Sequence, residues 1–133
     1  MSDWTHVAAI FRVDGIRGIT PDPDFDEVFG KECLFESPVE VWDDATEHPE
    51  AYLPLGSEGT LEKSVWVNPD RNCVAAYTVS VFGDLRDFSS IDEIMEWFEG
   101  CCGKCRIRQA AITVENEWNG EVRTAAYEKG GES

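Results

Sequence analysis

Residues 73–82 read CVAAYTVSVF, and this run decides the fold class of the chain. β-Branched and aromatic residues of this kind are enriched in strands, so the run predicts a β-strand. A second strand is predicted from Leu61 to Val67, and residues 68–72, NPDRN, have the composition of a turn. The two strands are therefore expected to form a β-hairpin, which Gly83-Asp84 should end.

Three further strands are predicted outside this hairpin. The first runs from Trp4 to Val13, where apolar residues alternate along the chain before Asp14-Gly15. The others run from Arg106 to Trp118 and from Glu121 to Glu128. Asn119-Gly120, which lies between them, is the dipeptide typical of a two-residue type I′ turn. All five strands can therefore belong to one sheet.

Two helices are predicted from capping-box patterns, in which a Ser precedes a Glu by three residues. Ser37-Pro38-Val39-Glu40 is expected to begin a helix over Pro38–His48. Ser90-Ile91-Asp92-Glu93 is expected to begin a second helix whose apolar residues share one face. Gly100 or Gly103 should end that second helix, because glycine is the usual residue just after a helix.

The predicted order is β-α-β-β-α-β with one more strand at the C-terminus, which is a ferredoxin-like arrangement. We therefore expect an α+β fold with an antiparallel sheet in the order 2-3-1-4-5, covered on one face by the two helices. A length of 133 residues and the absence of a linker predict a single domain over 1–133. An acidic loop-helix segment at 21–58 would then lie between strands one and two.

That segment holds much of the charge. The whole chain has a net charge of −16, and residues 22–58 hold twelve carboxylates and one cation, Lys31. Such a charge disfavours direct binding to nucleic acids and to anionic membrane surfaces, which both need Lys and Arg. Apolar residues make up 42% of the chain, which argues against a disordered acidic protein. The longest apolar runs are too short to span a membrane.

Aromatic residues within the acidic segment are expected to anchor it to the core. A single helical turn is predicted where Phe25, Val28 and Phe29 recur at helical spacing before Gly30. The other expected anchors are Phe35 and Trp42.

An ordered acidic surface of this kind predicts a non-enzymatic binding protein that docks on a basic protein, such as a nucleic-acid-binding host protein. In size and charge alone, the chain is similar to the small acidic inhibitors that phages and mobile elements encode against host machinery. The residues expected to bind the partner are Asp43, Asp44, Glu47, Glu50, Trp66 and Trp118.

Trp66 and Phe82 are expected on the sheet face that the helices leave open. Aromatic residues on an open sheet face favour a protein interface, including a homodimer formed through that face. The alternative is that the loop over residues 15–35 folds under the sheet and covers them.

A second functional hypothesis is a small-ligand binder or sensor, in oligomeric form, that holds an anionic metabolite or nucleotide. Arg106, Arg108 and Arg123 fall on predicted strands and are its candidate ligand-binding residues. The alternative for these arginines is pairing with carboxylates on neighbouring strands. The candidate partners are Glu115, Glu121 and Glu128.

Cys101, Cys102 and Cys105 are weak candidates for a metal or redox site, because a Cys-x-x-Cys pair lies among them. They follow a predicted helix, and the dipole at a helix C-terminus disfavours thiolates, so structural thiols are favoured. Asp44 and His48 are spaced for one helix face, where an exposed acidic surface is favoured over a cation site.

No catalytic motif, cofactor motif or phosphate-binding loop occurs, so neither an enzymatic activity nor a cofactor is predicted. The five cysteines are an odd number, and the residues from Met1 to Gly15 lack a cationic leader with an apolar core. Both observations favour reduced thiols and a cytoplasmic location.

Overall fold

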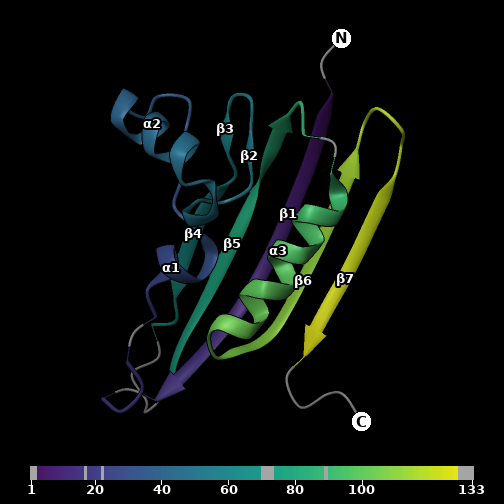
Figure 1. Cartoon of the computed structure of the whole chain (residues 1–133). Coiled ribbons are helices and arrows are strands. Elements are labelled where there is room, and N and C mark those ends of the chain that lie inside the picture. The colour runs from purple at the N-terminus through teal and green to yellow at the C-terminus, as the bar shows by residue number, and fades with distance from the viewer. Residues whose placement is uncertain (1–2, 17, 22, 70–73, 89, 129–133) are drawn as a thin grey trace.

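The computed structural model describes residues 3–16, 18–21, 23–69, 74–88 and 90–128. These residues form a mixed α+β fold with a five-stranded antiparallel sheet, as predicted (Figure 1). The strands of the sheet are β1 (Trp4–Ile16), β4 (Glu62–Val67), β5 (Val74–Arg86), β6 (Ile107–Asn116) and β7 (Val122–Glu128).

The strand order is β4-β5-β1-β6-β7, so β1 lies in the middle of the sheet. It pairs antiparallel with β5 on one side and with β6 on the other. The hairpin predicted from CVAAYTVSVF is the pair β4–β5, and the edges of the sheet are β4 and β7. The remaining elements are helices α1 (Phe25–Phe29), α2 (Val39–Glu47) and α3 (Ile91–Lys104), the 3-10 turn η1 (Pro49–Ala51), and a two-stranded ribbon of β2 (Leu55–Gly56) and β3 (Gly59–Thr60).

Two glycine positions do not end strands as predicted. β1 continues through Gly15 to Ile16, and β5 continues through Gly83 to Arg86. Gly83 has φ +145°, a backbone conformation that glycine adopts without steric cost, and it stays in register with Val7 of β1. Glycine therefore allows β5 to continue through this backbone conformation without leaving the sheet.

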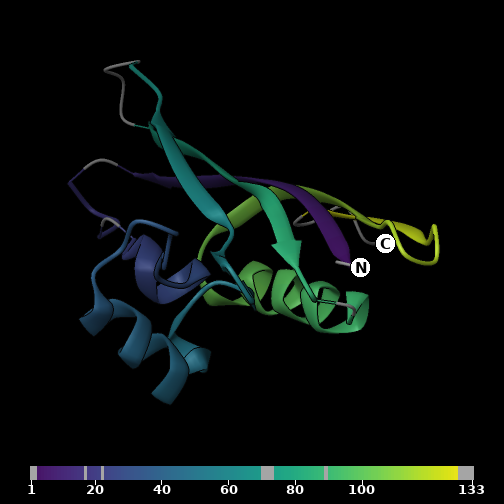
Figure 2. The ribbon, with the colours of Figure 1, turned by 90° about the horizontal axis from the view of Figure 1, so that it is seen from above.

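The main core lies between the sheet and the helices. Alternate residues of β1 point into it, and Phe11 of β1 is fully buried against the rings of Phe29 in α1 and Phe98 in α3. Seen from above, all the helices lie on one side of the sheet, and the other side is open (Figure 2). The pattern of one apolar and one exposed face is usual for an antiparallel sheet.

The helix predicted over Pro38–His48 forms as α2, but it does not cover the sheet as expected. The one-turn helix α1 packs on the sheet beside α3 instead, with Val28 and Phe29 in the main core. α2 packs on a second, smaller core that Cys33, Ala45 and Tyr52 form. The physical reason is that α2 buries only Ala45 of its own residues, too little apolar surface to cover a sheet.

The predicted caps have mixed outcomes. Ser90 caps α3 by accepting a hydrogen bond from the Glu93 backbone, as predicted. Ser37 does not cap α2, because its hydroxyl accepts from the Leu34 backbone and Pro38 takes the cap position. α3 also runs past Gly100 and Gly103 and ends only at Lys104.

The β6–β7 connection is wider than the predicted two-residue turn. β6 ends at Asn116 and β7 begins at Val122, with Asn119-Gly120 inside a longer loop. The Asn116 side chain accepts from the Asn119 backbone, and this contact closes a turn within the loop. None of the helices within the described residues is both long and apolar enough to cross a bilayer.

Candidate functional site

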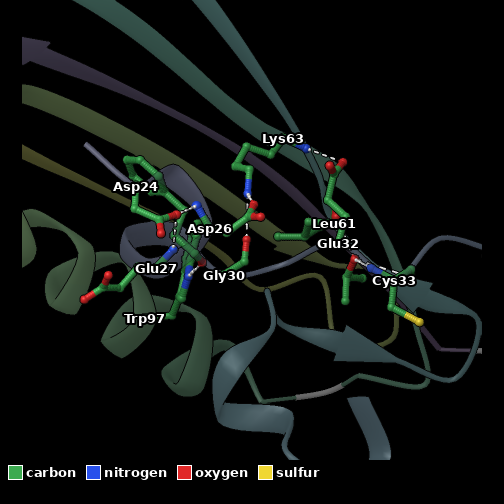
Figure 3. A network of polar contacts seen from close by, with 11 residues as sticks. Asp24, Asp26, Glu27, Gly30, Glu32, Cys33, Leu61, Lys63 and Trp97 are labelled. Carbon is green, nitrogen blue, oxygen red and sulfur yellow. Dashed lines mark hydrogen bonds and ion pairs between the residues drawn. The ribbon is translucent and has the colours of Figure 1, made fainter. Parts of the chain in front are cut away.

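The acidic segment is fastened to the edge of the sheet by Lys63 of β4 (Figure 3). The Lys63 side chain is only 7% exposed. Its Nζ donates to Asp26 Oδ1 at 2.5 Å and to the Gly30 carbonyl at 2.8 Å. The Lys63 backbone N–H donates to a Glu32 carboxylate oxygen at 3.0 Å. One buried cation and its backbone therefore hold three positions of the segment.

Further hydrogen bonds tie the segment to α3 and β3. Trp97 Nε1 donates to the Phe29 carbonyl at 2.8 Å (Figure 3), and the Cys33 backbone donates to Thr60 Oγ1 at 2.9 Å. Gly30 has φ +115°, and a Cβ there would meet the Leu53 backbone nitrogen at 2.5 Å. Only glycine fits this approach, so the turn after α1 is packed directly against the returning chain.

Several carboxylates of the segment have internal structural roles. Asp24 caps α1 by accepting from two backbone N–H groups, and Glu58 pairs with Arg86 at 2.5 Å. Asp44 accepts from the Tyr52 hydroxyl at 2.7 Å. That hydrogen bond, together with burial, raises the pKa of Tyr52 to about 12. Asp44, one of the predicted partner-binding residues, therefore supports the fold.

The outer side of α2 and the turn before it carry the remaining charge. Glu36, Glu40, Asp43 and Glu47 are exposed, and none of their side chains makes a hydrogen bond or ion pair to another described residue. Glu40, Asp43 and Glu47 recur at positions i, i+3 and i+7, so they form one stripe along the helix. Glu50 follows in η1, also exposed, at 3.7 Å from His48 Nδ1.

Two large apolar side chains are exposed among these carboxylates. Phe35, in the turn before α2, is 80% exposed, and Val39 at the start of α2 is 70% exposed. The prediction that Phe35 anchors the segment to the core is therefore wrong, and Cys33, fully buried two residues earlier, is the anchor instead. We name the set Phe35, Glu36, Val39, Glu40, Asp43 and Glu47 the α2 face.

The predicted aromatic partner residues lie elsewhere. Trp66 is on the edge strand β4 and is 57% exposed, on the open side of the sheet. Trp118 is 68% exposed in the loop between β6 and β7, at the opposite edge. The structure therefore does not join the two tryptophans with Asp43 and Glu47 into one surface. Phe82 is also exposed, so described residues of the loop over 15–35 leave this side of the sheet uncovered.

The three arginines proposed for an anionic ligand are also separated. Arg123 pairs with Asp92 of α3 and with Glu121 at 3.0 Å, and these contacts raise the pKa of Arg123, with Glu121 the larger cause. Arg108 lies at the other end of β6, at 3.7 Å from Asp14. Arg106 lines a cavity of about 430 Å³ near the C-terminus of α3.

The cysteines of α3 are held as thiols. Cys101 and Cys102 are buried, and burial raises their pKa values to about 12 and 11. Burial also raises the pKa of the half-buried Cys105. A protonated thiol is a poor nucleophile and a poor metal ligand. In the part of the chain that the structure describes, no three His, Cys, Asp or Glu side chains are grouped to hold a metal ion.

Sequence reasoning did not identify the contacts of His6. Its imidazole lies between Asp84 of β5 and Glu117 at the start of the β6–β7 loop, and both carboxylates raise the pKa of His6, Asp84 the more. The alternation along β1 was the available signal, because it turns His6 toward the open side.

Comparisons of this chain with models of protein families, with curated proteins and with solved structures give no match.

Proposed function

We propose that this chain is a non-enzymatic binding protein whose α2 face docks on a basic protein. The observation that carries the proposal is the exposure of Phe35 and Val39 among carboxylates that have no partner within the described residues. Apolar side chains at the centre of an interface supply most of the binding free energy, and a charged rim supplies steering and specificity.

The way the acidic segment is held supports the same conclusion. The contacts of Lys63, Trp97 and Thr60 fix the chain on which the α2 face is mounted. A surface that is already ordered loses less conformational entropy on binding, so more of the contact energy appears as affinity. An acidic tail without these contacts would pay the ordering cost at each encounter.

The kind of partner follows from charge. A net charge of −16 favours a partner rich in Lys and Arg, and nucleic-acid-binding proteins carry such surfaces. We propose that the chain acts as an inhibitor of the phage or mobile-element kind, in a cytoplasmic setting. The reduced thiols of Cys33, Cys101 and Cys102 are compatible with that setting.

Capture from a host lysate with matched variants tests this function. The test variant combines Glu40→Gln, Asp43→Asn and Glu47→Gln on α2. The control combines Glu93→Gln, Glu96→Gln and Glu99→Gln on α3, which removes the same charge from exposed positions of another helix. A third variant, Phe35→Ser with Val39→Ser, keeps the charge and removes the apolar centre. The retained proteins are identified and compared at low and high salt.

The proposal expects a basic protein that the wild type and the α3 control retain equally. The α2 charge variant should lose at least about tenfold in affinity for it, mainly through the association rate at low salt. The Phe35/Val39 variant should lose a similar amount, mainly through dissociation. Equal losses from the α2 and α3 charge variants would show that only net charge matters, and would contradict a specific α2 face.

A second candidate is the binding of a small anionic ligand beside Arg106. The cavity of about 430 Å³ is large enough for a small molecule, and Lys104 and Arg106 both line it. Asp14, Asp24 and Glu27 also line it, which disfavours a highly charged anion. A thermal-shift screen with nucleotides and amino acids tests this candidate, because a bound ligand raises the melting temperature. No shift across the screen would remove it.

We propose further that the sheet is ferredoxin-like, with β7 as an added strand, and that residues 1–133 fold as one domain. The antiparallel pairing of β1 with both β5 and β6 supports this plan, and so does the position of α3 on one face. Cooperative unfolding with coincident loss of helix and sheet signals would agree with one domain. Two separate transitions would contradict it.

A further inference from the structure

The open side of the sheet has an uncharged centre. Side chains on this side come from all five strands, because residues paired across β4, β5, β1, β6 and β7 alternate together. Charged residues make up 29% of the chain, yet among the described residues of the two middle rows of this face the only charged one is Glu62, on the edge strand β4. The other nine residues of these two rows are uncharged: Ala8, Ile10, Ser64, Ser80, Phe82, Ala111, Thr113, Thr124 and Ala126.

This centre departs from what a solvated sheet face requires. The water-facing side of an antiparallel sheet is normally polar, and charged residues keep such a face from self-association. Here Ile10 is 47% exposed and Phe82 is 42% exposed on neighbouring strands. A chain with 27 carboxylates has ample charge to place on this face, so a centre with so little charge, and with Ile10 and Phe82 exposed, needs a reason outside the monomer.

Apart from Glu62 at the β4 edge, charge appears on this face only toward the two ends of the strands, and the two ends differ. At one end His6 lies among three carboxylates, Asp84, Glu115 and Glu117. Six residues along β1, Arg12 has no ion pair within the described part of the chain. The second end also holds Arg108 beside Asp14, and Glu128 of β7 across from Gln109. One end is therefore acidic, and the other offers two arginines against two carboxylates.

The centre of this face also has a shape that can fit against a second copy of itself. Ile10 stands between two shallow hollows on the face. The first has a volume of about 350 Å³ and is lined by Ala8, Phe82 and Thr113, toward the acidic end. The second, about 420 Å³, is lined by Arg12, Ala126 and Glu128, toward the other end. A branched side chain beside a hollow lined by alanine can serve as both knob and hole in a symmetric contact.

We propose that two copies of this chain associate through their open sheet faces, with the strands of the two sheets running antiparallel. A two-fold axis crossing β1 near Ala9 places Ile10 over the hollow beside Ala8 of the second copy. The same axis places Arg12 over the acidic end of the second copy, where His6, Asp84 and Glu115 lie. The alternative axis, along the strands, would place the two acidic ends against each other, and that repulsion disfavours it.

The size of the face fits this occupant. Five strands spaced about 4.8 Å apart, with about eight residues each rising 3.4 Å, make a face of about 650 Å². A standard stable interface buries about 800 Å² per partner, and the exposed Trp66 at the β4 edge adds to the area available. Two sheets that pack face to face lie about 10 Å apart with their strands within about 30° of one another, as this pairing requires.

The dimer leaves the α2 face accessible. All helices lie on the side of the sheet away from the open face (Figure 2), so α2 points outward from both copies. The two surfaces can therefore be tested separately. A failure of the dimer would leave the proposed docking function unaffected, and the reverse also holds.

Sedimentation equilibrium of the full chain, over a wide concentration range at low ionic strength, is the primary test. The wild type should show a monomer–dimer equilibrium. Ile10→Glu should raise the dissociation constant at least about a hundredfold, because the symmetric contact would bury two new carboxylates. Val39→Glu adds the same charge at an exposed apolar position of α2 and should leave the dimer intact. Thermal unfolding of each variant checks that it is folded.

A charge exchange tests the orientation of the two copies. Arg12→Glu should weaken the dimer about tenfold, and adding Glu115→Arg to it should restore most of the loss. Arg12 pairs with Gln109 in the sheet and Glu115 pairs with His6, so the two sites are too far apart for a restored contact within one chain. A wild type that stays monomeric at about 1 mM, where even weak interfaces associate, would overturn the proposal. So would an Ile10→Glu variant that dimerises as well as the wild type.

Discussion

The Nζ of Lys63 lies 2.5 Å from an Asp26 carboxylate oxygen, and the lysine is nearly buried while the aspartate is largely exposed. This pair joins the edge strand β4 to the one-turn helix α1. It fixes the point from which the acidic segment leaves the sheet, so the position of the α2 face depends on it. The neighbouring Gly30 carbonyl accepts from the same Nζ.

Lys63→Met should lower the free energy of unfolding by about 1–3 kcal/mol, because Met keeps most of the buried volume but leaves the Gly30 carbonyl without its donor. Urea unfolding measures the change. Lys104→Met, at an exposed position near the end of α3, is the matched control and should change stability by less than about 0.5 kcal/mol. Similar effects of the two substitutions would show that the Lys63 contacts do not stabilise the fold.

Phe35→Ser should leave the free energy of unfolding within about 0.5 kcal/mol of the wild type, since 80% of the side chain is already in water. Phe29→Ala, at a position that is 1% exposed, should cost about 3–5 kcal/mol. Chemical denaturation measures the free energy of unfolding of both variants. The comparison distinguishes a residue that is available for binding from one that stabilises the core. A large loss of stability in Phe35→Ser would mean that Phe35 is a core residue in solution.

His6 should titrate above its ordinary pKa of 6.5, because hydrogen bonds to Asp84 and Glu117 favour the imidazolium. Its contribution to stability is fully present below pH 6.5 and is lost as the pH rises through the folded pKa. The stability difference between the wild type and His6→Gln should therefore shrink as the pH rises.

NMR titration of the imidazole measures the pKa of His6 directly. The double variant Asp84→Asn with Glu117→Gln should bring that pKa down toward 6.5. A His6 pKa that is the same with and without the two carboxylates would contradict the proposed contacts.

Alkylation should distinguish the three cysteines at the C-terminal end of α3 and just after it. Cys105 is half-buried and should react first in the native protein, whereas Cys101 and Cys102 should react only as the protein unfolds. The reason is that burial raises their pKa values to about 12 and 11, so almost no thiolate is present at neutral pH. Mass spectrometry after timed iodoacetamide treatment gives the order. Rapid alkylation of Cys101 in the folded protein would instead support a redox role for these cysteines.

The strands and helices of this protein were largely predictable from local patterns. Three examples are the alternation in β1, the β-branched run of β5 and the Ser90 cap. Each depends on residues close in sequence, so each can be predicted without knowledge of the tertiary structure. The continuation of β1 past Gly15 and of β5 past Gly83 was not predictable. Glycine has a low strand propensity, but pairing with a neighbouring strand can keep it in the sheet.

The candidate site was only partly predictable. The charge of the segment over 22–58 is visible in the sequence, but Asp26 and Asp44 are used internally, which depends on the distant Lys63 and on Tyr52. Phe35 has the sequence context of a buried anchor, and only its position outside the small core around Ala45 exposes it. Local pattern cannot separate these cases, because burial is decided by contacts between segments.

The sequence by itself determined the α+β class, the main strands, the net charge and the absence of recognisable catalytic motifs, since each is a property of composition or of short-range spacing. Only the tertiary structure decided which helix covers the sheet, which carboxylates remain free and which sheet face has little charge at its centre. These features depend on strand register and packing. The surroundings of Ile10 and Arg12, for example, are set by their neighbours on β5 and β6. A shift of one residue in that register would have turned the same side chains into the core.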